Sequence, residues 1–152
     1  MIFHNESEYS EDWKSYISYV DDKSHVGFFF VDLGLAGFAP IEGKNFLIRL
    51  TLNLLKPDEN GMPDDAEIET LNAVEDSLVT TMESKFDTVY PGRVTLDGKC
   101  TFYFYVSDNT LPYEQTFNKI MAVFPDYSFE YNAATPDHGW NCYFAYLLPE
   151  EE

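Results

Sequence analysis

The chain is poor in basic side chains. Lysine and arginine together number 9 against 27 aspartates and glutamates, so the formal charge of the 152 residues is −18. An acidic surface repels the phosphates of nucleic acids and the headgroups of anionic lipids, and it favours basic partners. We therefore expect a basic protein as partner, and neither nucleic acid nor a membrane. A solvated acidic surface that serves only solubility is the simpler alternative.

Cysteines are few, and long apolar runs are missing. Cys100 and Cys142 both lie in apolar, strand-like runs, which favours small buried thiols in a reducing compartment over a disulfide. Residues 1–10 contain no apolar signal core, and the longest apolar run, 26–31, is far too short to cross a bilayer. The expected location is the cytoplasm.

Catalytic and metal-binding patterns are also scarce. There is no Gly-x-Ser-x-Gly motif, and the three histidines, His4, His25 and His138, fall in separate segments. Cys142 follows His138 by four residues, but a catalytic pair needs an exposed thiol within reach of its base. With Asp137 these two residues are also too few for a structural zinc site, which takes four ligands. The sequence predicts no catalytic residue, no metal and no cofactor.

Aromatic side chains are abundant. The 13 phenylalanines and 11 tyrosines, with 45% hydrophobic residues overall, predict a packed globule. At this length we expect a single domain over 1–152. It divides into a loose lead-in over 1–10, a hairpin and loop over 11–42, and a core over 43–149.

Alternating apolar residues and turn signals predict seven strands and two helices. The strands are expected at 13–20, 25–32, 45–55, 86–96, 99–107, 127–132 and 140–148, and the helices from Asp64 and over 110–124. Residues 21–24 predict a hairpin turn, and 33–42 a loop. Asp64 predicts a helix N-cap with Glu67 reaching back to it, and Asp97-Gly98 predicts a type I′ hairpin turn.

The order of these elements defines the predicted fold class, α+β. From residue 45 onward the order contains β-α-β-β-α-β, the ferredoxin-like pattern of an antiparallel sheet with two helices on one face. An N-terminal β-hairpin is added to it. Strand residues alternate between faces, so Phe102 and Phe104 are expected under the helices, and Tyr103 and Tyr105 on the open face.

The open face supplies most of the candidate interaction residues. They are Arg49, Asn53, Tyr103, Tyr105 and Tyr143, with Trp140 expected inside. Tyrosines with an apolar ring and a polar tip suit a docking surface, a ligand pocket, or packing under the N-terminal hairpin.

An acidic block without a base runs from Asp58 to Asp76. Such a run is usually a solvated helix face, but it also steers basic partners. Glu75 and Asp76 fall in the middle of the predicted helix, where the helix dipole contributes little. They complete the candidate interaction surface.

Short motifs spread over the chain carry a family resemblance. They are Trp13, Val31–Leu33, Ala39-Pro40, Gly61–Pro63, Leu71 with Glu75-Asp76, Asp97-Gly98, Phe102–Tyr105, Asp137, Trp140, Tyr143 and Leu148-Pro149. On these residues the chain resembles the bacterial domain of unknown function 695 family. That family is similar in architecture to the protein inhibitors of ribonuclease E of the regulator B type, which are acidic and act by binding a protein. The resemblance implies a regulatory binding module, without implying the same ribonuclease as target.

The leading functional expectation is a non-enzymatic protein-binding regulatory module, either an inhibitor or an immunity-type protein, with a homodimer as an open option. The alternative is a small-ligand sensor that binds on the open sheet face or at a dimer interface. Arg49, Asn53, Tyr103 and Tyr105 would line its pocket. A sensor needs a concave pocket with converging polar groups, whereas a docking module needs an exposed patch rimmed by charge.

Overall fold

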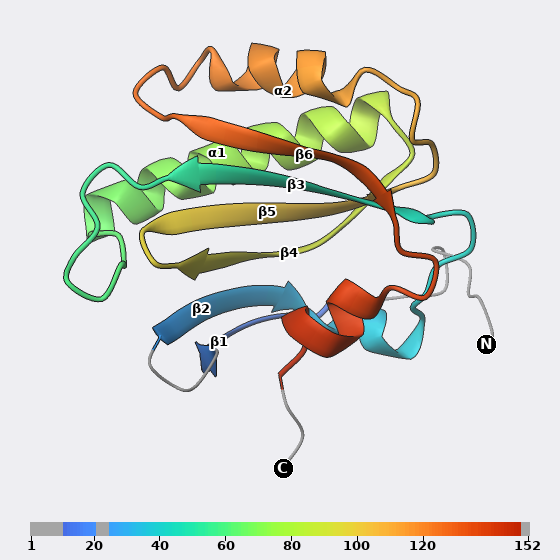
Figure 1. Cartoon of the computed structure of the whole chain (residues 1–152), viewed down its shortest axis with the longest axis horizontal. Coiled ribbons are helices and arrows are strands. Elements are labelled where there is room, and N and C mark those ends of the chain that lie inside the picture. Colours follow the sequence, from blue (N-terminus) through green and yellow to red (C-terminus); the bar gives the residue numbers. More distant parts are fainter. Residues whose placement is uncertain (1–10, 21–24, 150–152) are drawn as a thin grey trace.

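A computed structural model describes residues 11–20 and 25–149 of the chain. These residues form a six-stranded antiparallel sheet in the order β1-β2-β4-β5-β3-β6 (Figure 1). The strands are β1 (Trp13–Val20), β2 (His25–Asp32), β3 (Phe46–Asn53), β4 (Thr88–Leu96), β5 (Lys99–Val106) and β6 (Phe129–Pro136). The predicted lead-in over 1–10 and the predicted turn over 21–24 lie outside the described residues. The mixed α+β class is confirmed.

Two helices, α1 (Asp65–Lys85) and α2 (Tyr113–Met121), cover one face of the sheet (Figure 1). Under them lie Leu50 of β3 with Phe102 and Phe104 of β5, all fully buried, as their alternation predicts. The second helix is shorter than the predicted 110–124. No helix in the described part of the chain is both long and apolar enough to cross a membrane.

The start of α1 matches the predicted N-cap only in part. The side chain of Asp64 accepts a hydrogen bond from the backbone N–H of Glu67 at 2.8 Å, as expected. Glu67 does not reach back to complete a capping box. Its buried carboxylate instead accepts the backbone N–H of Leu55 at 2.7 Å and the hydroxyl of Tyr127 at 2.8 Å. This one carboxylate therefore ties the end of β3 and the approach to β6 to the first turn of α1.

Apolar residues recur at helical spacing along α1, but not all of them are buried. Leu71, Val74, Leu78 and Met82 are buried against the sheet, but Ile68 is 38% exposed. Ile68 faces a groove beside β2 rather than the core.

The hairpin between β4 and β5 follows the prediction. Asp97 and Gly98 both have positive φ, at 52° and 78°, as a type I′ turn requires. Around Pro91-Gly92 the strand β4 is irregular, and its register with β5 shifts between Val89 and Gly92. A Cβ at Gly92 would lie 2.5 Å from the carbonyl oxygen of Phe30, so β2 can approach β4 only because this residue is glycine.

The predicted strand over 140–148 is wrong. Trp140 has φ +56°, which breaks an extended chain, and a π-helical turn, η3 (Tyr143–Leu147), follows it. The preceding strand β6 is longer than predicted and runs to Pro136. An apolar run of this length is compatible with either a strand or a buried helical turn. Here Asp137 accepts hydrogen bonds from the backbone N–H groups of Asn141 and Cys142, which favours the helical turn.

The C-terminal turn builds a second core on the sheet face opposite the helices. It packs there with the 3₁₀ turn η2 (Leu33–Gly37) (Figure 1). The largest fully buried side chains of this core are Tyr105, Trp140 and Tyr143. Part of the face that we expected to be open is therefore covered by these two turns.

Replacing Phe104 by alanine tests the helix-side core. Phe104 is fully buried against Tyr90 and Phe117, so Phe104→Ala should lower the free energy of unfolding by about 3–5 kcal/mol. Urea unfolding followed by circular dichroism measures the change. The exposed Val123 provides the control, since Val123→Ala should stay within about 0.5 kcal/mol of the parent. Equal effects of the two variants would contradict this assignment of the core.

Candidate interaction surface

Tyr105 lies at the centre of the covered sheet face. Its ring stacks on that of Trp140, with centroids 4.0 Å apart and planes 4° from parallel. The indole N–H of Trp140 donates to the carbonyl oxygen of Lys44 at 2.8 Å. The prediction that Trp140 lies inside is therefore confirmed, but Tyr105 is fully buried too, and its expected place on an open surface is wrong.

A hydrogen bond holds this stack in place. The Tyr105 hydroxyl donates a hydrogen bond to Asp137 at 2.7 Å and accepts one from the backbone N–H of Tyr143 at 3.3 Å. Burial, and next the hydrogen bond to the Asp137 carboxylate, raise the pKa of Tyr105 well above that of a free tyrosine. Tyr105 is therefore a neutral hydrogen-bond donor that fastens the C-terminal turn to the sheet.

Two further predicted surface tyrosines are also buried. Tyr143 is fully buried, and its hydroxyl donates to the carbonyl oxygen of Asp32 at 2.7 Å. Tyr103 lies in the same core, with its ring centroid 6.3 Å from that of Tyr146. Their expected exposure is wrong for the same reason as that of Tyr105: the last apolar run folds back as a helical turn rather than continuing the sheet.

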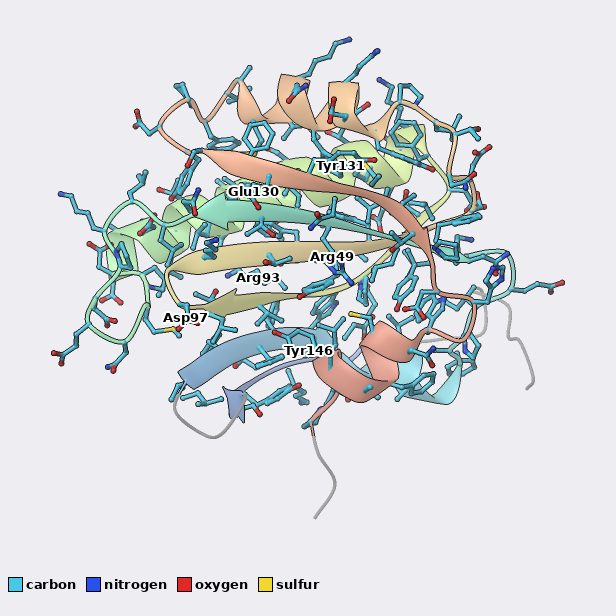
Figure 2. All side chains as sticks on the ribbon, in the orientation of Figure 1. Arg49, Arg93, Asp97, Glu130, Tyr131 and Tyr146 are labelled. Carbon is cyan, nitrogen blue, oxygen red and sulfur yellow. The ribbon has the colours of Figure 1, made fainter. Side chains whose placement is uncertain are left out.

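Arg49 and Asn53 lie on the same face, on the part left uncovered. Arg49 is half-buried, and Figure 2 shows it and Tyr146 on the face that carries the C-terminal turn. Asn53 is exposed, and its side-chain amide donates to Ser128 at 2.8 Å. Burial raises the pKa of Cys142, and the nearby Arg49 opposes the shift. Arg49 is also the cross-strand neighbour of the buried Tyr103, so it borders the second core, whereas Asn53 stays exposed at the end of β3.

Glu75 is held on the helix side of the sheet. Its carboxylate accepts the hydroxyl of Tyr90 at 2.6 Å and lies 3.5 Å from the guanidinium of Arg93. The same guanidinium donates to Asn72 at 2.8 Å. Glu75 is therefore a largely buried partner of two side chains rather than the free surface acid we expected. Its neighbour Asp76 is exposed.

A cavity with an aromatic floor and an acidic rim opens beside this pair. It has a volume of about 220 Å³ between α1 and the β1–β2 pair. Its rings form a contiguous cluster, with the centroid of Trp13 4.9 Å from Phe30 and 5.5 Å from Tyr90. Glu11 and Asp76 lie at its rim, and Glu11 accepts the indole N–H of Trp13 at 3.1 Å.

A second cavity of about 220 Å³ lies on the other side of Arg93 and is mainly apolar. Phe28, Ile68 and Met62 line it. Phe28 and Ile68 are both 38% exposed, although each has a large apolar side chain. We call the two cavities together the α1–β2 groove.

Sequence reasoning missed most of this groove. Glu75 and Asp76 were identified, but Trp13, Phe30 and Phe28 were interpreted only as strand residues. The available signal was the alternation of side chains along the N-terminal hairpin, which places Trp13 and Phe30 on one face of β1 and β2. The pairing of β2 with β4 then brings that face beside α1.

Another cavity, of about 460 Å³, lies where the loop at Asp58–Gly61 meets the hairpin turn Asp97-Gly98. None of the residues that line it lines the groove. Among the described residues, no three His, Cys, Asp or Glu side chains lie close enough together to hold a metal ion.

Substitutions at Tyr105 test the covered face. Tyr105→Ala should cost about 3–5 kcal/mol of unfolding free energy because a buried ring is lost. Tyr105→Phe should cost about 1.5–3 kcal/mol because a hydrogen bond to a carboxylate is lost. Urea unfolding measures both. The effects of Tyr105→Phe and Asp137→Asn should also be less than additive, and full additivity would mean that the two groups do not interact.

The buried tyrosines predict a loss of stability at high pH. Burial raises the pKa of Tyr16 and of Tyr113 to about 12, above the unfolded value of about 10. The stabilisation is therefore complete below about pH 10 and declines as the pH rises from about 10 to about 12. Unfolding free energies across this range, with tyrosinate absorbance, measure the loss. Tyr105→Phe should reduce its slope, and an unchanged slope would contradict the role of Tyr105.

The comparisons with known proteins concern the whole fold rather than the groove. A family model described as "Family of unknown function (DUF695)" matches residues 11–148. The searches of curated proteins and of solved structures return no match. The family match spans every described strand and helix from β1 to η3, and the chain therefore belongs to the DUF695 family of unknown function.

Proposed function

We propose that this protein is a non-enzymatic regulatory module of the cytoplasm that binds a basic protein. The observation that carries the proposal is the acidic surface along α1 and its approach. Seven carboxylates there are exposed: Asp58, Glu59, Asp64, Asp65, Glu69, Asp76 and Glu83. A surface of this kind steers basic partners and sets the rate at which they associate.

The placement of the basic residues supports the same proposal. Lys44 is buried, with its ammonium 2.9 Å from Asp87, and the side chain of Arg93 is only 11% exposed. These cations contribute little to the outer surface. Glu67 and Glu75 are largely withdrawn from the surface too, so the surface keeps the strongly acidic balance of the composition.

The two cysteines bear on whether the protein is a catalyst. Burial raises the pKa of Cys142, and raises that of Cys100 to about 11, so neither thiol is poised as a thiolate nucleophile. This favours binding over catalysis.

We also infer a ferredoxin-like unit formed by β3, α1, β4, β5, α2 and β6. The order β4-β5-β3-β6 and the two helices on one face support it. On that inference the similarity to the ribonuclease E inhibitors is one of architecture and of binding mode.

A small-ligand sensor is our second candidate. Its favouring observation is the uncovered polar part of the second sheet face, which carries the half-buried Arg49 and the exposed Asn53. We rank it below protein binding because Tyr103 and Tyr105, which were to line the pocket, are buried.

An affinity experiment tests the proposed function. The tagged protein is used as bait in a lysate of its native cells, at low salt and at about 1 M salt, where the Debye length falls to about 3 Å. One dominant basic protein should be captured at low salt and released at high salt.

Matched charge variants make this test specific. Replacing three acids of α1 (Asp65→Asn, Glu69→Gln, Asp76→Asn) should reduce capture about tenfold. Replacing three exposed acids elsewhere (Glu114→Gln, Asp126→Asn, Glu130→Gln) should reduce it far less. Equal capture by both variants, or no basic protein at either salt, would count against the proposal.

A further inference from the structure

The α1–β2 groove has two ends of different chemistry. At one end the rings of Trp13, Phe30 and Tyr90 line a cavity whose rim carries the carboxylates of Glu11 and Asp76. Aromatic faces attract cations within about 6 Å of the ring centre, and nearby carboxylates add to that attraction. This end has the composition of a site for the side chain of lysine or arginine.

The protein already uses this chemistry internally. The guanidinium of Arg93 lies 5.8 Å from the centroid of the Phe30 ring and 3.5 Å from the Glu75 carboxylate. One cation is therefore held between the same aromatic cluster and an acid of α1. A cation from a partner would make the same kind of contact on the solvent side, at Asp76 and Glu11.

The opposite end of the groove suits an apolar side chain. Phe28 and Ile68 remain partly exposed across a cavity that Met62 and Leu71 also line. Large apolar side chains in such a depression gain most when another apolar group covers them. Ile17, the cross-strand neighbour of Phe28, extends the exposed apolar surface to β1.

The distance between the two ends limits the shape of the ligand. Along α1, Ile68 marks the apolar end and Glu75 the acidic end. The distance between these residues along the helix axis is about 10 Å, at 1.5 Å per helical residue. An extended peptide covers that distance in about three residues at roughly 3.3 Å each. Glu75 lines the aromatic cavity and its partner Arg93 lines the apolar one, so this ion pair marks the boundary between the two cavities.

We propose that the α1–β2 groove binds a segment of a basic partner protein that presents a lysine or arginine about three residues from a large apolar side chain. This inference rests on the proposed function and names the site within it. Charge complementarity selects this occupant. A second copy of the chain would instead bring another molecule of charge −18 against an acidic rim.

A peptide-display selection tests the groove directly. A library of random nine-residue peptides is selected on the intact protein, and the enriched peptides are synthesised. They should carry a lysine or arginine about three positions from a leucine, isoleucine, methionine or phenylalanine. Binding should weaken as the salt concentration rises.

The two tryptophans allow the bound position to be read by NMR. Trp13 lines the groove, whereas Trp140 is buried on the opposite sheet face. The selected peptides should shift the indole N–H signal of Trp13 and leave that of Trp140 in place.

Paired variants then separate the groove from general surface charge. The double variant Glu11→Gln with Asp76→Asn keeps the hydrogen-bonding shape but removes two charges, and should weaken peptide binding about fivefold. Ile68→Ser should weaken it about tenfold. Glu114→Gln on α2 and Val123→Ser on another surface are the matched controls and should leave binding within about twofold of the parent.

The outcomes distinguish this inference from the proposed function. If no peptide is enriched, if enriched peptides lack a basic residue, or if the paired variants bind as the parent does, the groove is not the docking site. If the lysate partner is lost only in the triple α1 variant and not in Ile68→Ser, the acidic docking function stands and the groove is wrong. Peptide binding without capture of a basic protein would support the groove and contradict the proposed function.

Discussion

The hydrogen bond from Tyr105 to Asp137 determines which surfaces of this protein are accessible. Asp137 accepts the Tyr105 hydroxyl and, through the same carboxylate, the backbone N–H groups of Asn141 and Cys142. One side chain thus starts the C-terminal helical turn and fastens it to the sheet. Because Trp140 and Tyr143 follow directly, the turn brings two large rings onto a face that would otherwise be open. Because this part of the face is closed, the groove on the helix side is the more accessible apolar surface.

The sequence predicts the strands of the sheet better than the C-terminal turn that covers its second face. β1, β2 and β5 follow the predicted ranges closely, because strict alternation and the Asp97-Gly98 turn are strong local signals. The last element was misassigned because a short apolar run has no local feature that separates a strand from a buried helical turn. Its conformation depends on Asp137 meeting Tyr105, a contact between residues 32 positions apart in the chain. That contact can be recognised only once the fold brings the two residues together.

The candidate site illustrates the same limit. Asp76 was identified correctly as an exposed acid, because its position on α1 follows from helical periodicity. Glu75 was assigned to the surface as well, yet it is bound to Tyr90 and Arg93, which come from another element. Trp13 gained its significance only from the pairing of β2 with β4, which depends on Gly92 allowing the backbones to approach closely. Local patterns therefore predict which residue types are present, and long-range pairing decides which of them meet.

The Arg93–Glu75 pair has a further consequence for how the groove can work. A buried ion pair contributes little net stability when its desolvation is counted, but removing one partner leaves a costly unpaired charge. The pair is satisfied by neighbours on both sides, since Tyr90 donates to Glu75 and Arg93 donates to Asn72. It is thus a fixed divider whose carboxylate is already neutralised. An incoming cation is attracted instead by Glu11 and Asp76 at the rim. At the apolar end the ligand inserts an uncharged side chain, so no charge of the ligand has to lose its hydration there. A ligand must therefore place its basic group on one side of this ion pair and its apolar group on the other. The geometry of α1 sets the distance between the two groups.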